Sequence, residues 1–194
     1  MTNDPRPLFG RAAEQAAELV RSVRAEQLDG STPCTEFDVR ALLSHLTGAT
    51  HRVAVVAEGG DANAVRPFAE GVPDDGWTAA YDEARIRAVK AWAGDDRLDA
   101  VVRLPFGEMP GRAALSAYVL ETVTHTWDLS EALGRPRELD QELAEFALTV
   151  AQRMLPDEQR DENTPFATAR PAPEGADAYG RLAAWLGREP LSRA

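Results

Sequence analysis

Cysteine and lysine are scarce in this chain of 194 residues, which has one of each, Cys34 and Lys90. A single cysteine excludes an intrachain disulfide and any zinc site built from clustered cysteines. No apolar run approaches the ~20 residues that cross a bilayer, and residues 1–11 lack a basic segment followed by an apolar one. We therefore expect a cytoplasmic protein with no membrane partner.

Basic residues are also fewer than acidic ones. The chain has 21 lysines and arginines and 32 aspartates and glutamates, which gives a formal net charge of −11. A surface with this balance repels phosphate backbones, so the composition argues against nucleic acid as a partner. Hydrophobic residues make up 44% and charged residues 27%, which is typical of globular proteins. The length suits one domain with a single hydrophobic core.

Helical periodicity dominates the apolar pattern. The segment at 61–76 is rich in glycine, proline and aspartate, and the segment at 155–176 is rich in proline, acidic residues and threonine. We expect the first to be a loop and the second to be mostly irregular. Helices are predicted over about 8–27, from Thr35 or Asp38 to residue 56, and over about 75–93, 112–133, 140–154 and 177–186.

Residues 98–106 are too few and too β-branched for a helix, so they predict one strand or a small hairpin. A turn is expected at 107–111. Four long helices with short connections favour a helix bundle. The predicted fold class is therefore all-α with a minor β-hairpin.

The clearest candidate site is on the helix predicted over 112–133. Glu121, His125 and Asp128 are spaced by four and three residues, which places them within about 60° of one another on a helix. This arc is either the solvent stripe of an amphipathic helix or an inward-facing polar site. The positions above and below it are alanine or tyrosine, which favours the inward-facing site, although spacing alone leaves both interpretations open.

His45 is the histidine best placed to join these residues, because it lies beside the apolar stripe of its own predicted helix. Catalytic zinc takes three protein ligands and keeps one open position, and a ligand from a facing helix would complete the pair Glu121 and His125. His51 lies six residues further on, about 120° around the helix, so both histidines cannot face one metal. By spacing alone, a core histidine bonded to a carbonyl or hydroxyl is the more common outcome for His45.

Cys34 precedes a predicted helix, where the macrodipole lowers the pKa of a thiol. This permits a nucleophile, but a small buried side chain at the start of the helix is the favoured interpretation, and the role of Cys34 stays open. The tryptophans are expected in the core or at the bundle edge. They are Trp77, Trp92, Trp127 and Trp185.

Residues 32–46 (TPCTEFDVRALLSHL) resemble the N-terminal signature of the mycothiol-dependent maleylpyruvate isomerase-like family of actinobacterial proteins. That family belongs to the DinB-like superfamily of metal-binding helix bundles. Residues 121–129 (ETVTHTWDL) resemble its second signature. The sequences PF at 165–166, GRL at 180–182 and LGREP at 186–190 resemble the end of short actinobacterial relatives, so the resemblance covers nearly the whole chain.

The resemblance implies a DinB-like four-helix bundle that binds one divalent metal through His45, Glu121 and His125. Zinc is the expected metal and nickel the alternative, and Asp128 would orient His125 or a water. By this resemblance, residues 1–134 form the metal-binding bundle, and residues 135–194 form a C-terminal helical extension packed on the same domain. The isomerase has an additional C-terminal domain, for which the 60 residues after Gly134 are too few.

The implied function is that of a metal-dependent transferase or isomerase that uses mycothiol as cosubstrate and acts on small electrophiles. Two neutral imidazoles and one carboxylate leave a divalent cation with a net charge of about +1, which favours a thiolate at the open position. The alternatives are a non-catalytic metal- or ligand-binding bundle and a metal-dependent hydrolase. The expected partners are a small-molecule thiol and a small electrophile, and a homodimer is left open.

Overall fold

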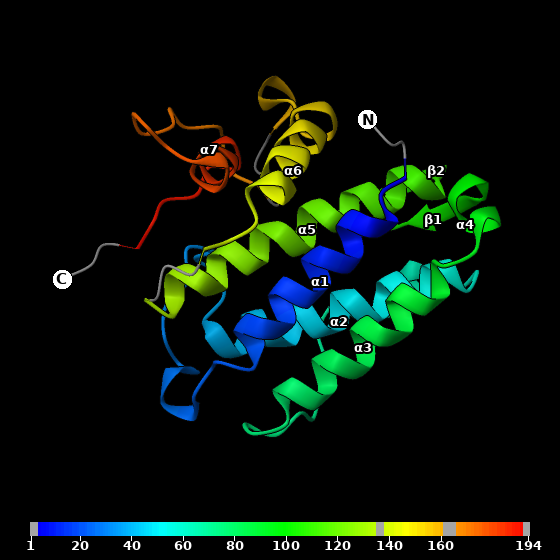
Figure 1. The fold of residues 1–194 in the computed structure, drawn as a ribbon, viewed down its shortest axis with the longest axis horizontal. Helices are drawn as coiled ribbons and strands as arrows, with labels where there is room; N and C mark the ends of the chain where they lie inside the picture. Colours follow the sequence, from blue (N-terminus) through cyan, green and yellow to red (C-terminus); the bar gives the residue numbers. More distant parts are fainter. Residues whose placement is uncertain (1–3, 135–137, 161–165, 192–194) are drawn as a thin grey trace.

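The computed structural model describes residues 4–134, 138–160 and 166–191, and it is mainly helical. Four long helices form its larger part and lie side by side (Figure 1). They are α1 (Arg6–Val20), α2 (Val39–Ala57), α3 (Trp77–Ala91) and α5 (Gly111–Ala132).

These four helices close a ring around one core. Helix α1 packs against α3 and α5, and α2 packs against the same two helices. Helices α6 (Gln141–Met154) and α7 (Ala178–Trp185) lie on the outer side of α5 and pack on it and on each other (Figure 1). The prediction of a four-helix bundle is therefore confirmed.

The predicted hairpin is also present, but its turn lies earlier than expected. Residues 105–106 make the turn, and residues 107–110, which were expected to be the turn, pair antiparallel with the first strand. Gly107 begins the second strand with a φ of 135°, a conformation that favours glycine. The elements of this region are α4 (Asp95–Asp99), β1 (Val101–Leu104) and β2 (Gly107–Pro110).

Helix α1 ends earlier than its apolar pattern predicts. The pattern continues to about residue 27, whereas the helix ends at Val20 and residues 25–27 form a separate 3₁₀ turn. The hydroxyl of Ser22 donates a hydrogen bond to the carbonyl of Leu19 at 2.8 Å, and such local bonds compete with the helical ladder. The other predicted helices lie within a few residues of the observed ones.

The loop before α2 is folded by hydrogen bonds of one threonine. The hydroxyl of Thr32 donates to the carbonyl of Phe37 at 2.7 Å and accepts from the backbone N–H of Cys34 at 3.1 Å. Asp38 then caps the helix, because its carboxylate accepts from the N–H of Ala41 at 2.7 Å. The loop thereby holds Phe37 and Cys34 at the N-terminal end of α2.

A glycine lets the chain cross α2 at close range. A Cβ atom at Gly48 would lie 2.5 Å from the backbone nitrogen of Phe68, so only glycine permits this crossing. Two hydrogen bonds hold the crossing segment, since Ser44 Oγ donates to the Ala69 carbonyl at 2.8 Å and the Ala69 N–H donates to the Ser44 carbonyl at 2.9 Å. Gly48 is about one helical turn from His45 on α2, so the crossing places Phe68 close to His45.

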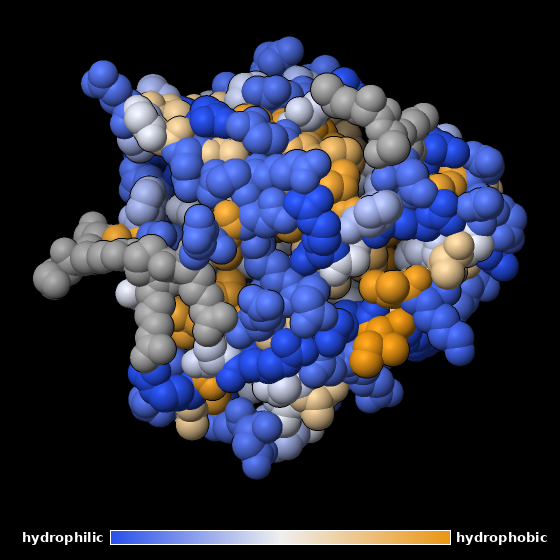
Figure 2. Space-filling model, in the orientation of Figure 1, coloured by the Kyte–Doolittle hydropathy of each residue, from blue (hydrophilic) through white to orange (hydrophobic). Residues whose placement is uncertain are grey.

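The surface is mostly hydrophilic in the face shown in Figure 2, with hydrophobic atoms in small separate groups. Helix α3 contributes two exposed apolar side chains, Ile86 and Val89, which are 59% and 44% exposed. Trp77, Trp92 and Trp127 are buried, as expected of core aromatics. Within the described ranges, the structure contains no helix with the length and apolar character needed to cross a membrane.

Candidate metal centre

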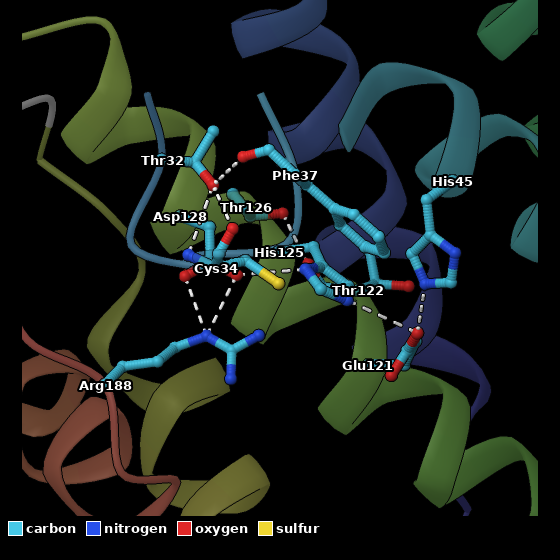
Figure 3. Close-up of polar contacts among 10 residues, drawn as sticks. All are labelled: Thr32, Cys34, Phe37, His45, Glu121, Thr122, His125, Thr126, Asp128 and Arg188. Atoms are coloured by element: carbon cyan, nitrogen blue, oxygen red, sulfur yellow. Dashed lines mark hydrogen bonds and ion pairs between the residues drawn. The ribbon is translucent and has the colours of Figure 1, made fainter. Parts of the chain in front are cut away.

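Helices α2 and α5 bring three predicted ligand side chains together. His45 comes from α2, and Glu121 and His125 are one turn apart on α5 (Figure 3). Nε2 of His45 lies 2.7 Å from Oε1 of Glu121, and Nε2 of His125 lies 3.4 Å from the same oxygen. One donor atom from each residue lies within 4.8 Å of the other two, close enough for one metal ion to lie among them.

The arc of ionisable residues on α5 faces the interior. Asp128 is completely buried, the side chain of His125 is 6% exposed and that of Glu121 is 30% exposed. The solvent-stripe interpretation is therefore wrong for this helix. His45 makes its hydrogen bond with a carboxylate, whereas a purely structural core histidine would be expected to bond a carbonyl or hydroxyl.

Asp128 fixes the orientation of the His125 ring. Its Oδ2 lies 2.9 Å from Nδ1 of His125, so this nitrogen is the protonated one in the neutral ring and Nε2 is left as the acceptor. Nε2 is also the nitrogen that faces Glu121. A carboxylate that holds the far nitrogen of a ligating histidine is the usual arrangement at protein metal sites.

Arg188 completes the chain of contacts behind His125. Its Nε donates to Oδ1 and Oδ2 of Asp128 at 2.8 and 3.0 Å, and its side chain is only 8% exposed (Figure 3). No periodicity or spacing in the sequence points to this residue. The only signal was its position in the LGREP sequence at 186–190, because Arg188 is 60 residues from Asp128 and outside any helix.

The charges of the site are strongly coupled. Desolvation opposes the carboxylate charge of Glu121, but attraction to His125 and hydrogen bonds with both imidazoles outweigh it and hold the pKa of Glu121 well below its usual range. Desolvation likewise opposes protonation of His125. Glu121 and Asp128 outweigh that effect and raise the pKa of His125 to about 9.

Two phenylalanines line the site on the side of His45. The ring centroids of Phe37 and Phe68 each lie 5.2 Å from that of His45, and Phe37 lies 6.1 Å from His125. The free space beside the three candidate ligands is small, about 10 Å³, and Tyr118 also lines it. A space of this size holds about one water molecule.

Residues 9–130 match the family described as the mycothiol maleylpyruvate isomerase N-terminal domain. The chain belongs to this family. Its fold is accordingly a DinB-like helical bundle, as the resemblance implies. Two uncharacterized proteins of Mycobacterium tuberculosis, from strains CDC 1551 and H37Rv, are each 35% identical over 185 residues, which cover 95% of this chain and 98% of theirs. No solved structure matches the chain.

In this member of the mycothiol maleylpyruvate isomerase N-terminal domain family, Cys34 forms a second group of potential ligands with His125 and Asp128. This group suits a metal poorly, because both oxygens of Asp128 accept hydrogen bonds from Arg188. Burial raises the pKa of the Cys34 thiol to about 11. Helix α2 begins only at residue 39, so Cys34 does not lie at its first turn. The expectation that the helix macrodipole lowers the pKa of the Cys34 thiol is therefore wrong.

His51 joins neither of the two groups of potential ligands found in the described residues. It lies on α2 with His45, but six residues further along the helix. This placement agrees with the prediction that the two histidines cannot face one metal. His51 is therefore a suitable control position for experiments on metal binding.

Proposed function

We propose that this chain is a metal-dependent enzyme that uses mycothiol as cosubstrate and acts as a transferase or isomerase on small electrophiles. One observation carries the proposal: two imidazole nitrogens and a carboxylate oxygen converge within 4.8 Å on adjacent helices of a bundle. Membership of the mycothiol maleylpyruvate isomerase N-terminal domain family supports the choice of thiol.

The donor set fits a divalent metal. His45 Nε2, Glu121 Oε1 and His125 Nε2 would hold the ion, and a set of two nitrogens and one oxygen suits zinc, with nickel as the alternative. Three protein ligands leave a position open. A metal bound there supplies positive charge that favours the deprotonated form of a thiol.

The residues of the chain itself set the conditions for this chemistry. Asp128 keeps the proton of neutral His125 on Nδ1 and so keeps Nε2 free to act as a ligand. Glu121 stays ionised, because its pKa lies well below the usual range. Phe37 and Phe68 shield His45 from bulk water, which strengthens the electrostatic interactions of the site.

The small cavity supports a second candidate function. About 10 Å³ beside the ligands accommodates a water but not a thiol and an electrophile together. A hydrolase that uses a bound water, or a non-catalytic metal-binding bundle, needs no more room than this. The first proposal therefore requires that this space enlarges when substrates bind.

Two measurements separate these functions. Elemental analysis of the purified full chain should find about one zinc or nickel per chain. The metal-loaded protein is then incubated with mycothiol and an alkylating electrophile such as monobromobimane, and thioether formation is followed by fluorescence. Acceleration that requires both metal and mycothiol supports the thiol-dependent enzyme, whereas bound metal with no acceleration favours the second candidate.

A further inference from the structure

Tyr118 lies on α5 on the same side as two of the candidate ligands. It precedes Glu121 by three residues and His125 by seven, and residues at these spacings share one face of a helix. Tyr118, His45 and these two residues all line the small space of about 10 Å³ described above. Tyr118 therefore belongs to the wall of the candidate metal centre, although it is not one of the three candidate ligands.

The hydroxyl of Tyr118 is buried without a hydrogen bond. Its oxygen is closed to solvent and has no hydrogen-bond partner among residues 4–134, 138–160 and 166–191. A buried hydroxyl is costly unless a polar group reaches it, because it has given up its hydrogen bonds to water. Packing of the bundle would be served equally well by phenylalanine at this position, so the hydroxyl itself needs another explanation.

The surroundings of Tyr118 favour a negatively charged partner. Burial raises the pKa of the phenol, so the group stays an O–H donor at neutral pH. The positive charge of Arg52 opposes this rise, and Arg52 is held in place by hydrogen bonds to the carbonyl of Val65 at 2.6 and 3.2 Å. A divalent ion held by two neutral imidazoles and one carboxylate adds a net charge of about +1 on the other side.

We infer that the O–H of Tyr118 donates a hydrogen bond to a small anion that enters this space beside His45, Glu121 and His125. Hydrogen bonds to ionised acceptors are shorter and stronger than those between neutral groups, so this donor selects anions over neutral ligands of the same size. The inference rests on the metal centre of the proposed function. It extends that proposal because it assigns a specificity-determining residue that serves a thiolate and other small anions alike.

The inference is tested by azide binding to the cobalt-substituted full chain, followed by visible absorption. Azide is a small linear anion that can coordinate through one nitrogen and accept a hydrogen bond. Tyr118→Phe removes only the hydroxyl, and it should weaken azide binding about tenfold or more while leaving the affinity for cobalt unchanged. Tyr179→Phe is the matched control. It removes a phenol hydroxyl on α7 that accepts a hydrogen bond from Gln15, outside the site, and it should leave azide binding unchanged.

Two further measurements separate a direct hydrogen bond from a structural effect. The infrared stretch of azide bound to the zinc-loaded protein should shift in Tyr118→Phe and stay in place in Tyr179→Phe. In the metal-free protein, Tyr118→Phe should be at least as thermally stable as wild type, because it removes an unpaired buried hydroxyl. Tyr179→Phe should be less stable, because Gln15 loses its acceptor.

Unchanged azide affinity and an unchanged azide stretch in Tyr118→Phe would overturn the inference. A lower melting temperature of metal-free Tyr118→Phe would also overturn it, because the hydroxyl would then be bonded within the protein. Failure of the proposed function is distinguishable from both results. Metal-loaded protein that binds azide through Tyr118 and shows no reaction with mycothiol would refute the thiol-dependent enzyme and leave the inference standing, whereas a chain that binds no metal would refute both.

Discussion

Oδ2 of Asp128 lies 2.9 Å from Nδ1 of His125, and through this contact Asp128 connects the candidate metal site to the C-terminal segment. The same carboxylate accepts two hydrogen bonds from Arg188 in the C-terminal segment. A change at residue 188 can therefore alter the orientation of a candidate metal ligand without touching it.

Asp128→Asn should lower zinc affinity about 10- to 100-fold, because the amide no longer offers His125 a negatively charged acceptor. The affinity is measured by competition with a chromogenic chelator. The substitution also leaves Arg188 without its counterion, so the double variant Asp128→Asn/Arg188→Gln provides a neutral pair. It should recover thermal stability and keep the weakened zinc affinity. Unchanged affinity in both variants would show that Asp128 does not orient a ligand.

His45→Ala and His125→Ala should each abolish stoichiometric binding of zinc or nickel. Each removes one of three donors and leaves the other two badly placed for a single ion. His51→Ala, on the same helix as His45 but in neither ligand group, should retain full metal content. Elemental analysis of dialysed protein gives the result, and wild-type metal content in His125→Ala would remove the residue from the site.

Zinc affinity should rise with pH up to about 9. The pKa of His125 in the metal-free protein is raised to about 9 from its ordinary 6.5, so the ring is protonated at neutral pH and must lose this proton to bind metal. Below pH 9, apparent affinity is therefore expected to rise about tenfold per pH unit. Calorimetry at pH 7.5 in buffers of different ionisation enthalpy should detect release of about one proton. Affinity that is flat from pH 7 to 8.5 would contradict the raised pKa.

The parts of the site that could be predicted are those encoded locally. The spacing of Glu121, His125 and Asp128 specifies one helical arc, and the neutral positions around it indicated that the arc faces inward. Arg188 could not be located by periodicity, because its contact with Asp128 depends on where an irregular segment meets α5. A single contact of that kind leaves no pattern in a sequence.

The position of the hairpin turn, which was predicted too late in the sequence, and the position of Phe68 both depend on contacts between separate segments. Glycines and prolines at 107–111 indicated a turn, but strand pairing places the turn two residues earlier. Gly48 is helical and has no conspicuous neighbours in the sequence, yet it permits the close crossing that brings Phe68 to His45. Its role depends on a backbone 20 residues away, which local propensities do not contain.

Gly48→Ala should open the aromatic side of the site. The added methyl would lie 2.5 Å from the Phe68 nitrogen, so the crossing segment must move away from α2, at a cost of about 1–3 kcal/mol of unfolding free energy. Zinc should then dissociate faster to an excess of chelator. Gly10→Ala is the control, because nothing lies within 4 Å of its added methyl, and it should be neutral or stabilising. Equal thermal stability of the two variants would exclude the close crossing.

Cobalt-substituted protein should report directly on thiol binding at the proposed site. Thiolate ligation to cobalt produces an intense sulfur-to-metal charge-transfer band. We expect this band when mycothiol is added at neutral pH, well below the free thiol pKa near 8.5, because a cation held by two neutral imidazoles and Glu121 favours the thiolate. Glu121→Ala and His125→Ala should not show it. His51→Ala should behave as wild type, which separates loss of the site from a general effect of substitution.

Normal cobalt binding with a spectrum that no thiol changes would refute the thiol-dependent enzyme but not the metal site. Hydrolysis or simple metal binding would then explain the candidate metal site better.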